Sequence, residues 1–484
     1  MTRIRSEVSL IWILTAIVVP WRNFPPGSRS LPLIGILLEL LGKQWLTFTE
    51  LGKEYGDLMY FNVAGKPLVV LNSRKTAADL LDCRAGKFSN RPRNIVASDI
   101  MTTGNLVVFT RYGDVSRRMR KAAHEGLNKA VVYKYHPIQT AEAVLLTAGV
   151  LAEPEWNSHL RRTTASAIMS MVYGTPPTSE QDPLVKNINE FAARLGRAAT
   201  SGAHFVEFFS LMQYAKWKRE AEESCAKESA MFEGLFNGAK DRLMRAHLAS
   251  TLIQDAGRHN LTEKESSLNS AAVSETSSGV MSWWTLAMIV YPETQKRAQA
   301  KLDAVVGRDR LPSFADYEHL PYIRAMVKEA LRWRMVLPRR STEDDVYDGY
   351  FIPTGTILIA NVWHLNRDPE TYGSDAEHFN PARHLDKDGK LAPGPADTKE
   401  ESHVTYGFRH VANNSLFIDM TMMLWAMNIE RATDENSVPL PLDVDGCVED
   451  GLVTRPVPFK AKITPRFREA QAIVEQEQEL LGYH

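Results

Sequence analysis

Apolar residues recur at helical spacing over much of the chain. Between Val131 and Ile253 they form a succession of segments separated by prolines, which predicts several helices. Leu261–Val290 has the pattern of one long helix that stops before Pro292, and Glu293–Val306 has the pattern of a charged amphipathic helix. These periodicities indicate that helices dominate the middle of the chain.

Extended patterns are fewer and shorter. Leu58–Val63 and Pro67–Leu71 flank a turn at Gly65, which predicts a β-hairpin, and Phe48–Tyr55 ahead of them has helical spacing. Tyr350–Ile359 predicts further short extended runs around the turn residues Pro-Thr-Gly-Thr. The sequence therefore predicts a minor β component beside the helices.

One short helix pattern, Val327–Arg332, carries a pair of opposite charges. Glu329 and Arg332 are three residues apart, so they lie on the same helical face. Such a pair is usually solvated and contributes roughly a few tenths of a kcal/mol. Its meaning depends on the segments that follow it in the chain.

Composition narrows the classes of protein. The 484 residues are 44% hydrophobic and carry a net charge of −1, whereas a nucleic-acid-binding protein would have a basic excess. The length alone suggests about two to four domains. Cys83, Cys225 and Cys447 are the only cysteines, and their wide spacing excludes a disulfide framework and any Cys-x-x-Cys metal site. This cysteine usage fits a reducing compartment.

The N-terminus carries an apolar run, Val8–Trp21, preceded by Arg3 and Arg5. A membrane-spanning helix needs about 20 apolar residues, so this run is short. No small-residue cleavage site follows it, as would follow a signal peptide. We interpret residues 1–21 as a shortened membrane anchor, with a disordered apolar start as the alternative.

Four segments taken together resemble one family: Glu329-x-x-Arg332, Pro353–Thr356, Asn361–Asp368 and Phe379–Leu385. They are similar to the cytochrome P450 family of heme-thiolate monooxygenases, and the chain looks closest to its fungal microsomal members. The resemblance implies a mainly α fold with a smaller β-rich lobe. It also implies that Glu329, Arg332 and Arg383 form a buried triad that braces the heme-binding face.

The same resemblance predicts how the chain is organised. Residues 1–21 would be the anchor, 22–35 a proline-rich hinge and 36–465 the catalytic domain. Residues 466–484 would be a polar helical tail, which we expect to be solvated. Ile95–Phe109 would be the loop that roofs the active site.

Candidate site residues follow from the family's motifs. Glu275 and Thr276 match the acid–Thr pair that manages protons for the iron-bound oxygen. The candidates for contacts with the heme propionates are arginines, because a guanidinium suits two-pronged contact with a carboxylate; they are Arg117, Arg120, Arg339 and Arg340.

Cofactors, partners and location are also implied by the resemblance. Heme b would be the cofactor, and a flavoprotein reductase would supply electrons from NADPH. The substrate would be a small apolar organic molecule, and no nucleic acid would be involved. The expected location is the endoplasmic reticulum membrane, on its cytosolic face.

The chain departs from the family where the iron ligand belongs. Phe408 passes directly to Arg409, so the Gly- and Arg-rich loop that delivers the Cys thiolate is missing and no metal ligand is predicted. Two smaller departures are Val273, where the family has Gly, and Ser116, where it has Trp.

Several explanations remain open at this point. A misplaced splice site could have removed the segment, or the gene could have decayed. In functional terms, the chain is an enzyme that lacks a fragment, or a catalytically inactive membrane-associated scaffold that binds partners or lipid. A third hypothesis is a hemoprotein ligated by His403 or His410.

Overall fold

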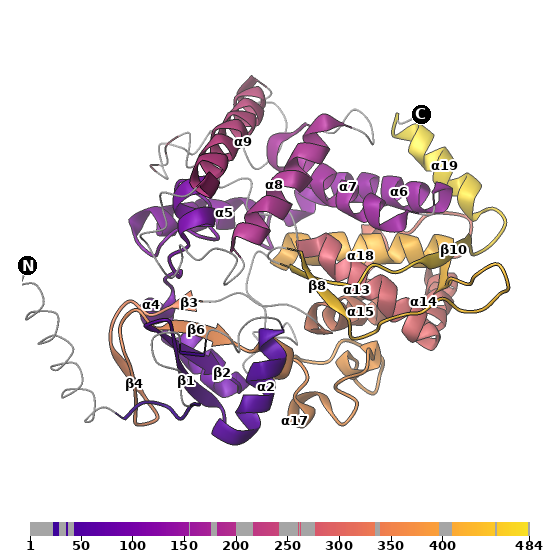
Figure 1. The fold of residues 1–484 in the computed structure, drawn as a ribbon. Coiled ribbons are helices and arrows are strands. Elements are labelled where there is room, and N and C mark those ends of the chain that lie inside the picture. The colour runs from indigo at the N-terminus through magenta and orange to yellow at the C-terminus, as the bar shows by residue number, and fades with distance from the viewer. Residues whose placement is uncertain are drawn as a thin grey trace, which may run out of the picture. The chain divides into compact units, whose positions relative to one another are not determined.

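The computed structural model describes residues 23–28, 35–36, 43–153, 155–175, 182–199, 216–241, 260, 262, 276–333, 339–395, 409–450 and 453–482. It forms two compact units (Figure 1). The smaller comprises residues 1–92 and 337–365, and the larger comprises residues 93–336 and 366–484. The predicted mainly α fold with a smaller β-rich part is confirmed.

The smaller unit is built on a four-stranded sheet of order β1-β2-β6-β3. The pairs β1–β2 and β6–β3 are antiparallel, and β2–β6 is parallel. Its helices and strands are α2 (Gln44–Tyr55), β1 (Leu58–Val63), β2 (Lys66–Leu71), α3 (Arg74–Ala78), η2 (Asp79–Cys83), α4 (Ala85–Phe88), β3 (Arg339–Arg340), β4 (Asp345–Tyr347), β5 (Tyr350–Ile352), β6 (Ile357–Ala360) and α16 (Val362–Leu365).

The predicted hairpin forms because its turn residues suit a tight reversal. Ala64 and Gly65 both have positive φ, 48° and 84°, as a two-residue hairpin turn of the primed type requires. The backbone N–H of Gly65 also donates to Asn62 Oδ1 at 2.8 Å. Strand β2 then buries Val69 and Val70 completely, so the hairpin belongs to the core of the smaller unit.

The larger unit is mostly helical. Its elements are η3 (Ile95–Met101), α5 (Asp114–Leu127), η4 (Val132–Tyr135), α6 (His136–Ala152), α7 (Trp156–Ile168), η5 (Met169–Tyr173), α8 (Pro183–Ala199), α9 (Lys216–Asp241), α13 (Thr276–Val290), α14 (Pro292–Val305), η9 (Phe314–His319), α15 (Pro321–Trp333), α17 (Pro369–Tyr372), η10 (Pro381–His384), α18 (Arg409–Ala426), β7 (Met427–Arg431), β8 (Cys447–Asp450), β9 (Val453–Pro456), β10 (Ala461–Pro465) and α19 (Ala470–Leu480).

The main core of this unit lies around α13 and α18. Helix α18 packs against α6, α14 and α15, and Figure 1 shows these helices side by side. Helix α13 and the later part of α18, residues 416–426, are buried on nearly every face, as expected of segments surrounded by other elements. Trp283, Trp284 and Trp425 are among the largest fully buried side chains, and they fill this core.

Some expectations need correction. The expected solvated tail at 466–484 contains α19, whose Ala470 and Val474 are fully buried in the main core. Phe467 packs edge-on against Trp425 with ring centroids 5.0 Å apart. The described part of the tail is therefore integral to the larger unit, because its few apolar residues share one helical face. The expected roof loop Ile95–Phe109 also begins with a helical segment, η3.

Other predicted elements lie partly outside the described residues. The expected anchor, residues 1–21, lies wholly outside them. Of the long helix expected at Leu261–Val290, the structure describes the part from Thr276 onward as α13. No helix in the described ranges combines enough length and apolarity to span a membrane.

Candidate functional site

The predicted triad lies in the larger unit and begins on helix α15. This helix has one buried face, because its apolar residues recur at helical spacing. Glu329 and Arg332 fall on that face, and neither side chain has any exposed area. Arg332 Nε lies 2.8 Å from Glu329 Oε2, and Arg332 Nη2 lies 2.8 Å from Glu329 Oε1. The pair is thus a two-pronged buried ion pair, unlike the solvated pair that spacing alone would suggest.

The third member, Arg383, comes from the short helix η10, far along the chain. Arg383 Nε donates to Glu329 Oε1 at 3.1 Å, and Arg383 Nη1 donates to Asp375 Oδ1 at 3.0 Å. The backbone N–H of Asn380 donates to the same Glu329 oxygen at 2.9 Å. The structure therefore brings Glu329, Arg332 and Arg383 into one cluster, which we call the buried triad.

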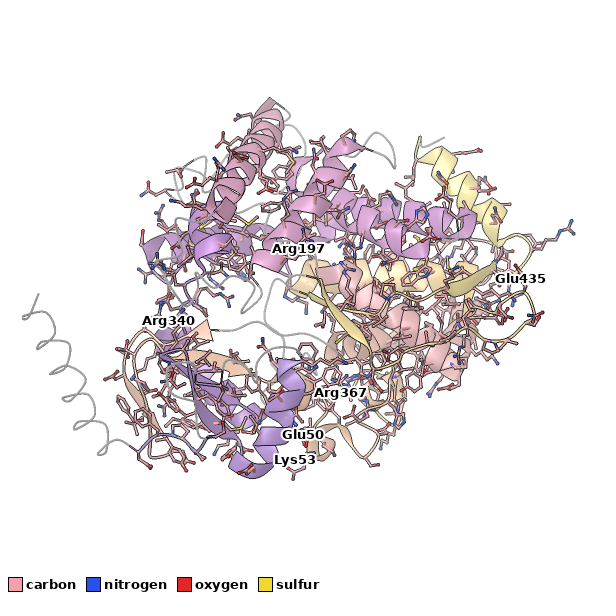
Figure 2. All side chains as sticks on the ribbon, viewed as in Figure 1. Glu50, Lys53, Arg197, Arg340, Arg367 and Glu435 are labelled. Atoms are coloured by element: carbon pink, nitrogen blue, oxygen red, sulfur yellow. The ribbon has the colours of Figure 1, made fainter. Side chains whose placement is uncertain are left out.

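The remaining donors of the buried triad are also paired. Arg332 Nη1 donates to the carbonyl of Asn366, and its guanidinium carbon lies 5.1 Å from the centroid of the Tyr372 ring. Arg367, labelled in Figure 2, donates to the carbonyl of Trp333 at 2.7 Å, where α15 ends. These contacts join α15 to the 366–384 segment.

Charge keeps Glu329 ionised. Burial by itself would raise the pKa of this carboxyl, but the hydrogen bonds from Arg332 and His384, followed by the charge of Arg332, lower the pKa far below its ordinary value. Asp375 is also held ionised, because hydrogen bonds from Asn380 and the charge of Arg383 outweigh burial and lower its pKa. Two carboxylates therefore balance two guanidiniums.

The residues that sequence reasoning missed are Asp375, Asn380 and His384. His384 Nε2 lies 2.8 Å from Glu329 Oε2, and only 4% of its side chain is exposed. Arg383 was found because it belongs to a recognisable motif. Asn380 and His384 belong to the same motif, but the sequence carried no signal for their contacts in the cluster, and Asp375 lies just before the motif.

The four arginines expected at the heme propionates fall in different units. Arg117 and Arg120 are on α5 in the larger unit, whereas Arg339 and Arg340 form β3 in the smaller unit. The Arg117 side chain is 58% exposed and lies 3.9 Å from Asp114, and Arg120 is also exposed. Arg340, labelled in Figure 2, is half-buried and donates through Nε to the carbonyl of Gly355 at 3.1 Å.

Two further positions concern the expected proton path and the lost Trp. Glu275 lies outside the described residues, and Thr276 is the first residue of α13. Ser116, at the position where the family has Trp, is buried on α5 with 2% exposure.

The described donors do not fit a heme-thiolate site. In the family the thiolate precedes the helix that corresponds to α18, whereas Cys83 ends η2, Cys225 lies inside α9 and Cys447 begins β8. Cys225 Sγ is 3.9 Å from Ser229 Oγ, within its own helix. Among the described residues, no three His, Cys, Asp or Glu side chains form a group that could hold a metal ion. No step of oxygen chemistry can be assigned to these side chains.

A mainly helical unit that buries one glutamate between two arginines, with a small sheet-based unit, is the arrangement expected of the cytochrome P450 fold. The family model described as Cytochrome P450 matches residues 25–408. The chain belongs to the cytochrome P450 family and is, by family, a heme-dependent monooxygenase. The match ends at Phe408, the residue after which the ligand-bearing loop is missing.

Curated relatives are similar over nearly the whole chain. Two cytochrome P450 monooxygenases from Armillaria gallica are 82% identical, covering 100% of both chains, and 62% identical, covering 99% of this chain and 100% of the relative. Cytochrome P450 monooxygenase 253 from Postia placenta is 44% identical, covering 92% of this chain and 89% of the relative. The first alignment spans 521 positions, more than the 484 residues of this chain, so that relative carries residues with no counterpart here.

Proposed function

We propose that this protein has the fold of a monooxygenase that inserts one atom of O2 into an apolar organic substrate. The chain as given lacks the segment that would ligate heme iron. The observation that carries the proposal is the intact buried triad in a chain without a suitably placed thiolate. A thiolate ligand favours O–O cleavage. We therefore expect the chain as given to be inactive as a monooxygenase.

The missing segment is best explained as an omission at a misplaced splice site. Two observations support this explanation: the family match stops at Phe408, and the 82%-identical relative is aligned over more positions than this chain possesses. The completeness of the buried triad also favours a misplaced splice site over long decay of the gene. A decaying gene accumulates substitutions even where the loss of one buried charge destabilises the fold, whereas all three residues are present here.

In the complete protein, we assign the residues the roles that the family motifs imply. Glu275 and Thr276 would deliver protons, and Arg117, Arg120, Arg339 and Arg340 would be the candidates for binding the heme carboxylates. Electrons would come from NADPH through a flavoprotein reductase, at the cytosolic face of the endoplasmic reticulum. Residues 1–21 would anchor the chain there, and a shift of the protein to the soluble fraction after their removal would support that role.

The decisive experiment is the carbon monoxide difference spectrum of the reduced protein. Three versions would be compared: the chain as given, the chain with a Gly/Arg-rich segment carrying one Cys between Phe408 and Arg409, and the same insertion with Ser in place of Cys. We expect a thiolate-type band only in the second version. The Ser version controls for the effect of lengthening the chain.

Other outcomes would identify the rival hypotheses. A thiolate-type band from the chain as given would overturn the proposal. Heme binding by the chain as given that is lost in His403→Ala or His410→Ala would favour a His-ligated hemoprotein. A transcript that joins the codons of Phe408 and Arg409, with no band in the version carrying the Cys insertion, would favour an inactive scaffold that binds partners or lipid.

A further inference from the structure

The two oxygens of Glu329 are held differently, and His384 holds the one with fewer donors. Oε1 accepts hydrogen bonds from Arg332 at 2.8 Å, from the Asn380 backbone at 2.9 Å and from Arg383 at 3.1 Å. Oε2 has two neighbours, Arg332 Nε and His384 Nε2, each at 2.8 Å. Of these two, only His384 comes from outside the helix that carries Glu329.

The charges around His384 determine its protonation state. Glu329 and Asp375 balance Arg332 and Arg383, so a protonated imidazole would add an unbalanced positive charge beside the fully buried Glu329–Arg332 pair. Burial, which is the largest effect, lowers the pKa of His384, and the charges of Arg332 and Lys328 lower it too; the bond to Glu329 opposes them without reversing the shift. A neutral imidazole has one N–H, and a carboxylate can only accept, so that N–H must be on Nε2.

The backbone around His384 is itself fixed. Asn380 caps η10 by accepting from the Ala382 N–H at 3.1 Å, and the carbonyl of His384 accepts from the Ala392 N–H at 2.9 Å. Consecutive residues, Arg383 and His384, thus bind the two different oxygens of one carboxylate. Rotation of the Glu329 carboxylate would break both contacts at once.

We propose that His384 is a positioning residue of the buried triad: as a neutral Nε2–H donor it fixes the carboxylate plane of Glu329, and through it the places of Arg332 and Arg383. This makes the cluster a tetrad in this chain. The inference concerns side chains that are all present, and it holds whether or not the thiolate segment is restored.

The test compares two substitutions in the full chain. His384→Gln places an amide N–H where the imidazole Nε2–H lies, whereas His384→Met fills the space without a donor. We expect His384→Gln to unfold close to the wild-type temperature and His384→Met to unfold several degrees lower. The exposed His319, replaced by Gln, is the matched control and should leave the unfolding temperature unchanged.

A second measurement needs no variant that might fail to fold. Nitrogen NMR of the wild-type chain with labelled histidines should contain one neutral imidazole protonated at Nε2 that stays neutral well below pH 6.5, the ordinary pKa, and this signal should vanish in His384→Gln. An ordinary titration of that imidazole, or equal losses in the Gln and Met variants, would overturn the proposal. Neither result depends on the carbon monoxide spectrum, so the two proposals fail separately.

Discussion

Two glutamates buried in the larger unit have pKa values that are shifted in opposite directions. Glu329 on α15 has no exposed area and its pKa is far below the ordinary value. Glu142 on α6 is 4% exposed, yet its pKa is raised to about 7. Burial pushes both pKa values upward, so the difference must come from their partners.

The partners of Glu142 are fewer and weaker. The hydroxyl of Ser166 donates to its Oε1, but Arg162 Nη1 stays 3.7 Å from its Oε2, which is beyond hydrogen-bonding distance. A second buried carboxyl, Asp419 on α18, has its pKa raised by burial first and then by the charge of Glu142. Arg162 therefore faces two carboxyl groups, and at neutral pH a proton must neutralise the excess charge.

The comparison teaches that burial alone does not decide the charge of a carboxyl group. Charged donors in direct contact with both oxygens keep Glu329 ionised, whereas one distant guanidinium and one hydroxyl leave the pKa of Glu142 raised to about 7. A carboxylate that holds two arginines in place must stay ionised, because protonation would remove its negative charge and release the arginines.

The largest expected effect is that of Glu329→Gln. Gln keeps the size of the side chain but leaves the buried Arg332 without its counter-charge and Arg383 with Asp375 alone, which costs about 3–5 kcal/mol of unfolding free energy. Urea unfolding followed by circular dichroism at pH 7 would measure it. A loss below 1 kcal/mol, similar to that of an exposed pair, would mean that water reaches the buried triad.

The next effect depends on pH. Because the pKa of Glu142 rises from 4.5 to about 7 on folding, the folded state holds the proton of Glu142 more tightly than the unfolded state does. This proton therefore contributes fully to the free energy of unfolding below pH 4.5, and the contribution is lost as the pH rises through 7. Gln does not titrate, so Glu142→Gln should not show this fall in the free energy of unfolding as the pH rises. We expect the variant to gain roughly 1–3 kcal/mol on wild type between pH 5 and pH 8. Parallel stability curves for the two proteins would contradict the assignment.

A smaller effect is expected of Arg383→Lys. Lysine keeps the positive charge but cannot contact Glu329 and Asp375 through one planar group. The loss should be about 1–2 kcal/mol, because lysine retains the charge and one contact and loses about one hydrogen bond. If Arg383→Met costs no more than Arg383→Lys in the same urea titration, the geometry of the guanidinium matters and its charge does not.

The smallest effect is that of an exposed pair used as a baseline. Lys53 and Glu50, labelled in Figure 2, are 2.8 Å apart, but their side chains are 69% and 68% exposed. Lys53→Gln should change the unfolding free energy by less than about 0.5 kcal/mol, because water and salt screen such pairs. A larger change would mean that an exposed ion pair is not a valid baseline for the buried triad.

Much of the fold followed from local patterns. The hairpin β1–β2 lies where alternation and the Gly65 turn placed it, and α14 begins at Pro292, one residue before the expected start. The helical character of α19 was expected but its burial was not, because a short polar sequence with only a few apolar residues gives no sign that a core lies beneath it. Its Ala470 and Val474 are buried by elements far away in the chain.

By itself, the sequence determined the family, the places of Glu329, Arg332 and Arg383, and the direct junction of Phe408 and Arg409 where a ligand is expected. These depend on residue identity and short spacing. Only the tertiary structure decided that His384, 55 residues from Glu329, contacts the second oxygen of its carboxylate, and that Asp419 lies close enough to Glu142 to feel its charge. The physical reason is that the charge of a buried group depends on every donor within reach, and chain folding chooses those donors across distances that no local pattern encodes.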